Sequence, residues 1–157
     1  MRQHIVRAVL VAAVSLSLGA AASADRSKAV KSARQHRMLL QVDQNDPAVM
    51  NLALNNATNV IDYYRAKGEE VSVDLVTFGP GLNMLREDTS PVLDRIKQLK
   101  DYAFPSKIQF SACNNTKEGM EKKEGHPVTL TSQAVLVSSG VVHLIEMQEQ
   151  GWSYIRP

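Results

Sequence analysis

The sequence predicts a single α/β domain in which helices cover both faces of a mostly parallel, five-stranded sheet, a three-layer sandwich. Short apolar runs suited to buried strands alternate with longer segments of helical period. Strands separated by helices of this length form right-handed βαβ units. The chain of 157 residues is long enough for one sizeable core but not for two.

The first 24 residues have the pattern of an export signal. Two arginines precede an apolar stretch over residues 8–18, which ends at the cleavage signal Ala22-Ser23-Ala24. The stretch is short for a membrane span, which needs roughly 20 residues. We therefore expect a signal peptide over residues 1–24 and a periplasmic mature protein, with a retained N-terminal anchor as the alternative.

Charge gives no support for a nucleic-acid or membrane partner. The chain has 18 basic and 16 acidic residues, and the two arginines of the signal account for the formal surplus of +2. The mature chain is therefore balanced, whereas nucleic acids and anionic membranes attract basic surfaces. We expect no nucleic-acid partner, and no membrane association after signal cleavage.

The first strand and helix follow a polar lead-in. Residues 25–36 are polar, basic and without apolar period, so we expect them to be flexible. Residues 37–43 form an apolar run suited to a buried strand. Asp46 is then placed as the N-cap of a helix and Pro47 at its first position, and the apolar stripe continues until Lys67-Gly68 closes the helix.

The middle of the chain repeats this alternation. Residues 70–78 are expected to form a second strand that ends at Gly79-Pro80-Gly81, with a short helical turn over residues 82–86. Ser90-Pro91 again has the pattern of a cap followed by proline. Residues 107–112 are the third strand. The helix between them is expected to direct four apolar residues inward: Val92, Leu93, Ile96 and Leu99.

Two more strands complete the predicted sheet. Residues 114–123 form a short, highly charged helix, and residues 134–137 a fourth strand. Ser138-Ser139-Gly140 leads into the last helix, which Gly151 stops. Residues 152–155 can add a fifth strand at the edge of the sheet, where an apolar and aromatic surface would need covering.

The predicted topology places one cysteine where such sheets carry function. Ligands and reactive groups collect beyond the carboxyl ends of parallel strands. Those ends are residues 43–46, 78–81, 113–115 and 138–140. Cys113, the single cysteine of the chain, lies in this row.

Cys113 is the candidate catalytic residue. A thiol at the start of a helix meets unpaired N–H groups and the positive end of the helix dipole, which favour the nucleophilic thiolate. Asn114, Asn115 and Lys117 are placed to stabilise negative charge on sulfur. One cysteine cannot form an internal disulfide, so Cys113 is either a reactive thiol or a buried, apolar side chain.

Other motifs do not indicate a cofactor, a metal or a hydrolase. Gly79-Pro80-Gly81 lacks the spacing of a dinucleotide-binding loop and better fits a tight turn. The histidines have no metal-ligand spacing among themselves or with Cys113. Ser139 lies outside a G-x-S-x-G motif and fits an N-cap, and His143 is expected on the polar flank of the last helix. We expect no cofactor and no metal.

Four motifs, in order, resemble the DsrE/DsrF-like sulfur-relay superfamily. The resemblance extends from about residue 38 to the C-terminus and fits an exported, single-domain branch. The motifs are Leu52-Ala53-Leu54-Asn55-Asn56-Ala57, Phe78-Gly79-Pro80-Gly81-Leu82-Asn83-Met84-Leu85, Ser111-Ala112-Cys113-Asn114-Asn115-Thr116, and a closing pair, Ser139-Gly140-Val141-Val142 with Gln148-Glu149-Gln150-Gly151-Trp152-Ser153-Tyr154-Ile155-Arg156-Pro157.

The resemblance implies a DsrE-like α/β domain over residues 37–157 that assembles as homotrimers or homohexamers. It also implies that Cys113 accepts sulfane sulfur as a persulfide, as a sulfurtransferase-like carrier does. The candidate binding residues around it are Asn45, Gly79, Gly81, Asn83, Asn114, Asn115 and Lys117.

Three functions remain open at this point. Cys113 could carry sulfur from a donor protein to an acceptor, with its thiolate as the nucleophile. The fold could instead be a non-catalytic oligomeric module that binds a small ligand or a partner, with Cys113 buried and slow to alkylate. A third hypothesis is a redox-sensing thiol that forms an intermolecular disulfide.

Overall fold

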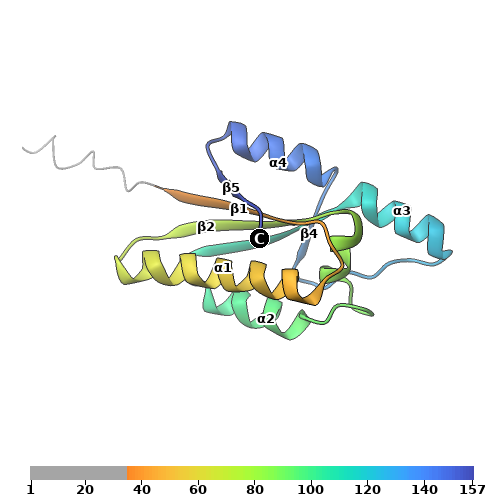
Figure 1. The fold of residues 1–157 in the computed structure, drawn as a ribbon, viewed down its shortest axis with the longest axis horizontal. Coiled ribbons are helices and arrows are strands. Elements are labelled where there is room, and N and C mark those ends of the chain that lie inside the picture. Colours follow the sequence, from red (N-terminus) through yellow and green to blue (C-terminus); the bar gives the residue numbers. More distant parts are fainter. Residues whose placement is uncertain (1–34) are drawn as a thin grey trace, which may run out of the picture. The chain divides into compact units, whose positions relative to one another are not determined.

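Five strands form a sheet that is parallel throughout, in the order β4-β3-β2-β1-β5. Helices α1 and α2 lie on one face of the sheet and α4 on the other, which confirms the predicted three-layer sandwich (Figure 1). The strands are β1 (His36–Val42), β2 (Val71–Thr77), β3 (Lys107–Cys113), β4 (Ala134–Val137) and β5 (Ser153–Ile155). The helices are α1 (Pro47–Ala66), α2 (Leu93–Tyr102), α3 (Asn114–Glu124) and α4 (Gly140–Glu149), with a 3₁₀ helix, η1 (Gly79–Leu85).

The structure, a computed structural model, describes residues 35–157. The predicted signal peptide and residues 25–34 of the predicted lead-in lie outside the described residues. Across residues 35–157, no helix combines the length and the apolar character that a membrane crossing requires.

Local signals set the ends of the longest helix. The carboxylate of Asp46 accepts a hydrogen bond from the Ala48 N–H at 2.7 Å, and Pro47 occupies the first helical turn, as predicted. The helix ends just before Lys67-Gly68, and Gly68 has a φ of 69°. Its buried stripe is Met50, Ala53, Leu54, Ala57 and Ile61, and Val60 and Tyr64, which also belong to the predicted stripe, are partly buried.

Several predicted boundaries were wrong. The short helical turn expected over residues 82–86 is η1, which begins at Gly79 and ends at Leu85. The first strand begins at His36, inside the predicted lead-in, because the His36 ring stacks on Tyr64 at 3.7 Å and its Nε2 lies 2.9 Å from a Glu69 oxygen. Helix α2 begins at Leu93 rather than at the Ser90-Pro91 pair. The Ser90 hydroxyl donates to the Met84 carbonyl at 2.5 Å and accepts from the Val92 N–H at 3.3 Å, so Ser90 joins the preceding turn to the residue before α2.

The two faces of the sheet are packed very differently. The main core lies between the sheet and helices α1 and α2, and Phe110 of β3 is fully buried within it. On the opposite face, the buried apolar cluster of the described residues consists of Leu39, Val76 and Leu144, with Phe78, Met147 and Trp152 partly buried against it. Helix α4 therefore has little apolar surface to fix its position.

Candidate functional site

The carboxyl end of β3 is the meeting point of two helix starts. Cys113 is both the last residue of β3 and the N-cap residue of α3. Because β4 pairs directly with β3, the start of α4, which follows β4, also reaches Cys113. The N–H of Asn115 donates to the Ser138 carbonyl at 3.3 Å, which joins the start of α3 to the segment before α4.

Cys113 is buried but surrounded by hydrogen-bond donors. Its exposed fraction is 4%. Burial raises the pKa of the thiol, but the hydroxyl of Thr116 and the backbone N–H groups of Gly140, Thr116 and Asn115 outweigh this and lower the pKa of Cys113 below its ordinary value. A thiolate at this position therefore faces the amino end of α3, where unpaired N–H groups favour negative charge.

Glycine at position 140 is what lets α4 come this close. A Cβ atom on Gly140 would lie 3.3 Å from the Cβ of Cys113 and 3.0 Å from the Cβ of Phe78. Such distances are shorter than an ordinary van der Waals contact, so a larger residue would push the first turn of α4 away. Two positive helix ends consequently face one sulfur atom.

Gly79 contributes to the site through Thr116. The Gly79 N–H donates to Oγ1 of Thr116 at 3.0 Å, which leaves the hydroxyl proton of Thr116 free to face the sulfur of Cys113. Gly79 has a φ of 51°, which favours glycine. Of the predicted binding residues, Gly79 is connected to the thiol through Thr116, and Asn115 contributes its backbone N–H.

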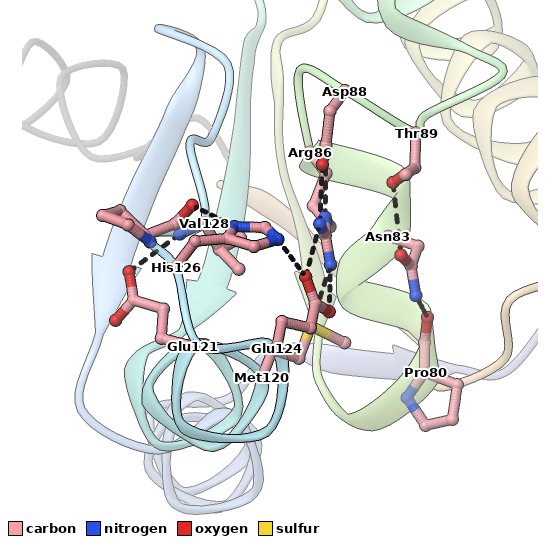
Figure 2. A network of polar contacts seen from close by, with 11 residues as sticks. Pro80, Asn83, Arg86, Asp88, Thr89, Met120, Glu121, Glu124, His126 and Val128 are labelled. Atoms are coloured by element: carbon pink, nitrogen blue, oxygen red, sulfur yellow. Dashed lines mark hydrogen bonds and ion pairs between the residues drawn. The ribbon is translucent and has the colours of Figure 1, made fainter.

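Gly81 and Asn83 have structural roles in η1. A Cβ on Gly81 would lie 2.1 Å from the Val42 carbonyl oxygen, so η1 rests directly on the end of β1. The amide of Asn83 donates to the Pro80 carbonyl at 2.9 Å and accepts from the Thr89 hydroxyl at 3.2 Å (Figure 2). These contacts support the prediction of a tight turn at residues 79–81.

The other predicted side chains have partners of their own. Asn114 donates to Glu118 at 2.7 Å, along α3. The ammonium of Lys117 lies 2.5 Å from the Glu121 carboxylate, so it is paired rather than directed at the sulfur. Asn45 is exposed in the loop after β1, and β2 separates that strand from β3.

A buried arginine fastens α3 to η1, as Figure 2 shows. Arg86, at the end of η1, is 4% exposed and bonds two carboxylates. Its guanidinium donates to Glu124 at 2.6 and 2.9 Å and to Asp88 at 2.9 and 2.6 Å. Hydrogen bonds from Arg86 lower the pKa of both carboxyl groups. This network holds the helix whose first turn faces Cys113.

The prediction for His143 was wrong. Its Nε2 lies 2.8 Å from Oδ2 of Asp74, and the histidine side chain is only 13% exposed. The helix turns this polar residue inward because the sheet beneath it carries polar side chains. Ser111 donates to Asp74 at 2.7 Å, and Gln109 donates to Ser111 at 2.9 Å.

Thr116 and Gly140, at the thiol, and His143, on the helix that Gly140 begins, are the residues that the sequence interpretation did not assign. A signal for Thr116 was present, since it occupies the third position of a helix that starts at the cysteine. A signal for His143 was the charged Asp74 in the middle of an apolar strand, which needs a buried partner. Gly140 could be assigned only by knowing that β4 pairs with β3.

Two further surface features lie near α4. Exposed apolar residues gather on β4 and α4, namely Val135, Leu136, Val141, Val142 and Ile145, each between 45% and 53% exposed. At the opposite, amino ends of β2 and β3 there is an open cleft of about 400 Å³. The residues that line it include Ser72, Lys100, Phe104, Lys107, Gln109 and Trp152.

These features define a class: a parallel α/β protein with one polarised thiol at the carboxyl edge of its sheet. The chain belongs to the same family as MTH1491 from Methanobacterium thermoautotrophicum, whose solved structure is described as a protein of unknown function. The two share 30% sequence identity over 78% of this chain and 100% of that chain, with a TM-score of 0.64. The chain matches no protein-family model and no curated protein.

Proposed function

We propose that this protein is a periplasmic, DsrE-like carrier that accepts sulfane sulfur on Cys113. The observation that carries the proposal is the set of donors around the thiol, namely the Thr116 hydroxyl and the N–H groups of Gly140, Thr116 and Asn115. Such donors stabilise a thiolate, which is the form that attacks sulfane sulfur. They equally stabilise the terminal anion of a persulfide.

The transfer step needs no oxidant, because one S–S bond replaces another. The Cys113 thiolate attacks the terminal sulfur of a persulfide or polysulfide donor. The new Sγ–S bond forms as the S–S bond of the donor breaks, and the electron pair of that bond leaves with the donor as a thiolate. Cys113 then holds a persulfide, and an acceptor thiolate attacks its outer sulfur in the same manner, with the Cys113 thiolate as the leaving group.

The proposal includes a homotrimer or homohexamer. Its support is the exposed apolar surface on β4 and α4, since patches of this kind mark association sites. Val141, one residue after the glycine that faces Cys113, belongs to that surface. Export through the predicted signal over residues 1–24 would place the assembly in the periplasm, where the donor or acceptor would be a small sulfur compound or another protein.

Sulfur loading tests the carrier role directly. The protein is treated with polysulfide or thiosulfate, desalted and weighed by mass spectrometry. Wild type should gain the mass of one sulfur atom, reversed by a reducing thiol, and Cys113→Ser should gain none. Equal gains in both proteins would overturn the proposal.

A second candidate function has an observation of its own. The low exposure of Cys113, together with the open cleft at the amino ends of β2 and β3, fits a non-catalytic module that binds a small ligand. Lys100 and Lys107 favour an anionic ligand, and Trp152, the single tryptophan of the chain, lies in the cleft. Quenching of its fluorescence by small aromatic carboxylates, lost in Lys107→Ala, would favour this function. No change in fluorescence would count against it.

A further inference from the structure

We propose that Asp74 and His143 are positioning residues, which hold the first turn of α4 against the sulfur of Cys113. This inference rests on the reactive thiol of the proposed function and deepens it. Neither residue lies among the groups that stabilise the thiolate directly. Their effect would pass through the backbone of α4, whose Gly140 N–H is one of those groups.

The contact between the two residues is short and buried. Nε2 of His143 lies 2.8 Å from Oδ2 of Asp74, and the carboxylate side chain is 3% exposed. Because a carboxylate only accepts, Nε2–H of the imidazole is the donor. A buried carboxylate left without such partners is strongly destabilising, so this pair resists separation.

The strand side of the contact is equally well fixed. Ser111 donates to Oδ1 of Asp74 at 2.7 Å, and Gln109 donates to Oδ2 at 3.3 Å. Both residues are on β3, the strand that ends at Cys113, and Ser111 is fully buried. The carboxylate therefore cannot follow the histidine if α4 shifts. Through Asp74, α4 is attached to β3, the same strand that carries the thiol.

Among the described residues, the other contacts at the beginning of α4 are the close approach of Gly140 to Phe78 and Cys113 and the bond at Ser138. The buried apolar side chain of α4 is Leu144, which packs on Leu39 and Val76, while Val141 and Val142 are about half exposed. At the far end, a guanidinium nitrogen of Arg37 donates to the Gln150 carbonyl at 3.1 Å. The His143 contact is thus a polar side-chain attachment of the first turns of α4 to the sheet, and the bond from the Asn115 N–H to the Ser138 carbonyl holds the segment just before α4.

The spacing along α4 links the contact to the site. Residues three apart lie on the same side of a helix, so His143 and Gly140 both face the sheet. Gly140 is buried there, at a virtual Cβ distance of 3.3 Å from Cys113. Loss of the His143 contact would let the first turn lift, and the N–H of Gly140 would move away from the sulfur.

The test compares the pH dependence of Cys113 alkylation by iodoacetamide in matched variants. In His143→Ala the rate at neutral pH should fall by about tenfold, the size expected for losing one hydrogen bond to a charged group. The rate at high pH, where all of the thiol is ionised, should stay at or above that of wild type. His143→Gln, whose amide nitrogen can replace Nε2, should recover most of the neutral-pH rate, and Glu146→Ala, on the exposed side of α4, should match wild type.

A double variant protects the test from simple misfolding. In Asp74→Val with His143→Leu both members of the contact are removed, so no unpaired charge remains in the interior, and Ser111 keeps its bond from Gln109. The double variant should fold. Its alkylation should reach half of the maximal rate at a higher pH than in wild type, as in His143→Ala. If both variants are less stable but alkylate with the wild-type pH profile, the pair is merely structural and the inference is overturned.

The two proposals fail in distinguishable ways. If wild-type Cys113 gains no sulfur from polysulfide, the carrier role is lost, but the alkylation comparison still decides whether Asp74 and His143 position α4. If sulfur loading succeeds and the alkylation profiles are identical, only the positioning role is overturned.

Discussion

Gly140 and Cys113, at the ends of different strand–helix connections, approach so closely that a single added methyl group would fill the space between them. The virtual Cβ of Gly140 lies 3.3 Å from the Cβ of Cys113. Helices α3 and α4 both begin at this point, and the backbone N–H groups of both favour the thiolate. The reactivity of Cys113 should therefore depend on residues that do not react themselves but position these backbone N–H groups.

Gly140→Ala should slow the reaction of Cys113 at neutral pH. The new methyl would also lie 3.0 Å from the Cβ of Phe78, so the first turn of α4 must move outward and its N–H must leave the sulfur. We expect a loss of about 1–3 kcal/mol in the free energy of unfolding, as for other overpacked sites. Urea unfolding and iodoacetamide kinetics measure the two effects.

Gly119→Ala is the matched control for that variant. Gly119 lies within α3, and a Cβ at this position would meet nothing within 4 Å. Alanine favours a helix interior over glycine, so the free energy of unfolding should rise by about 0.5–1 kcal/mol. The alkylation profile should not change. Slower alkylation in this variant would show that any change in these helices disturbs the thiol. The proposal that Gly140 has a specific role at the sulfur would then be wrong.

Thr116→Val should raise the pKa of Cys113. Valine keeps the shape of threonine but removes the hydroxyl that favours the thiolate, and it leaves the Gly79 N–H without its acceptor. Alkylation at neutral pH should fall roughly tenfold, whereas the rate at high pH should hardly change. Thr116→Ser, which restores the hydroxyl, should restore the profile. An unchanged pH profile of alkylation in Thr116→Val would show that the Thr116 hydroxyl does not stabilise the thiolate.

The two glycines of the turn after β2 should respond very differently to alanine. At Gly81 the new methyl would lie 2.1 Å from a backbone oxygen of Val42, which cannot yield without moving β1, so we expect a loss of roughly 4 kcal/mol or more. At Gly79 the nearest atom is 4.0 Å away, and only the φ of 51° is unfavourable, at a cost of about 1–2 kcal/mol. Thermal unfolding of both variants distinguishes these costs. Equal losses would contradict the packing role of Gly81.

The order of strands and helices could be predicted because its signals are local. Asp46 with Pro47, Gly125 in a left-handed conformation and Ser139 each mark a helix end, and the structure uses all of them. Placing Cys113 at the carboxyl edge followed from parallel topology alone. The same reasoning worked less well at Ser90-Pro91, where the serine hydroxyl is engaged by the preceding turn.

The surroundings of Cys113 could not be predicted, because they depend on tertiary contacts. Gly140 reaches the thiol only through the pairing of β4 with β3. The direction of His143 was missed because apolar residues were assumed to face the sheet. The sheet beneath α4 is partly polar, with Asp74 and Ser111 buried in it, so Val141 and Val142 lie half exposed while the histidine turns inward.

The Arg86 network should make stability depend on pH in a defined direction. Hydrogen bonds from Arg86 lower the pKa of Asp88 and Glu124 in the folded protein (Figure 2). A carboxyl group with a lowered folded pKa stabilises the fold fully above its ordinary value, which is 4.5 for Glu124, and this stabilisation is lost as the pH falls through the folded pKa.

Glu124→Gln tests this dependence, because glutamine keeps the shape of the side chain but does not titrate. The variant should unfold at lower urea concentration than wild type at about pH 7, and the gap should narrow as the pH falls below the ordinary carboxyl range. Asp88→Asn should behave in the same way, since Arg86 donates two hydrogen bonds to each carboxylate. A gap that stays constant from neutral to acidic pH would mean that glutamine disturbs packing, and that the charge of Glu124 does not hold α3 against η1.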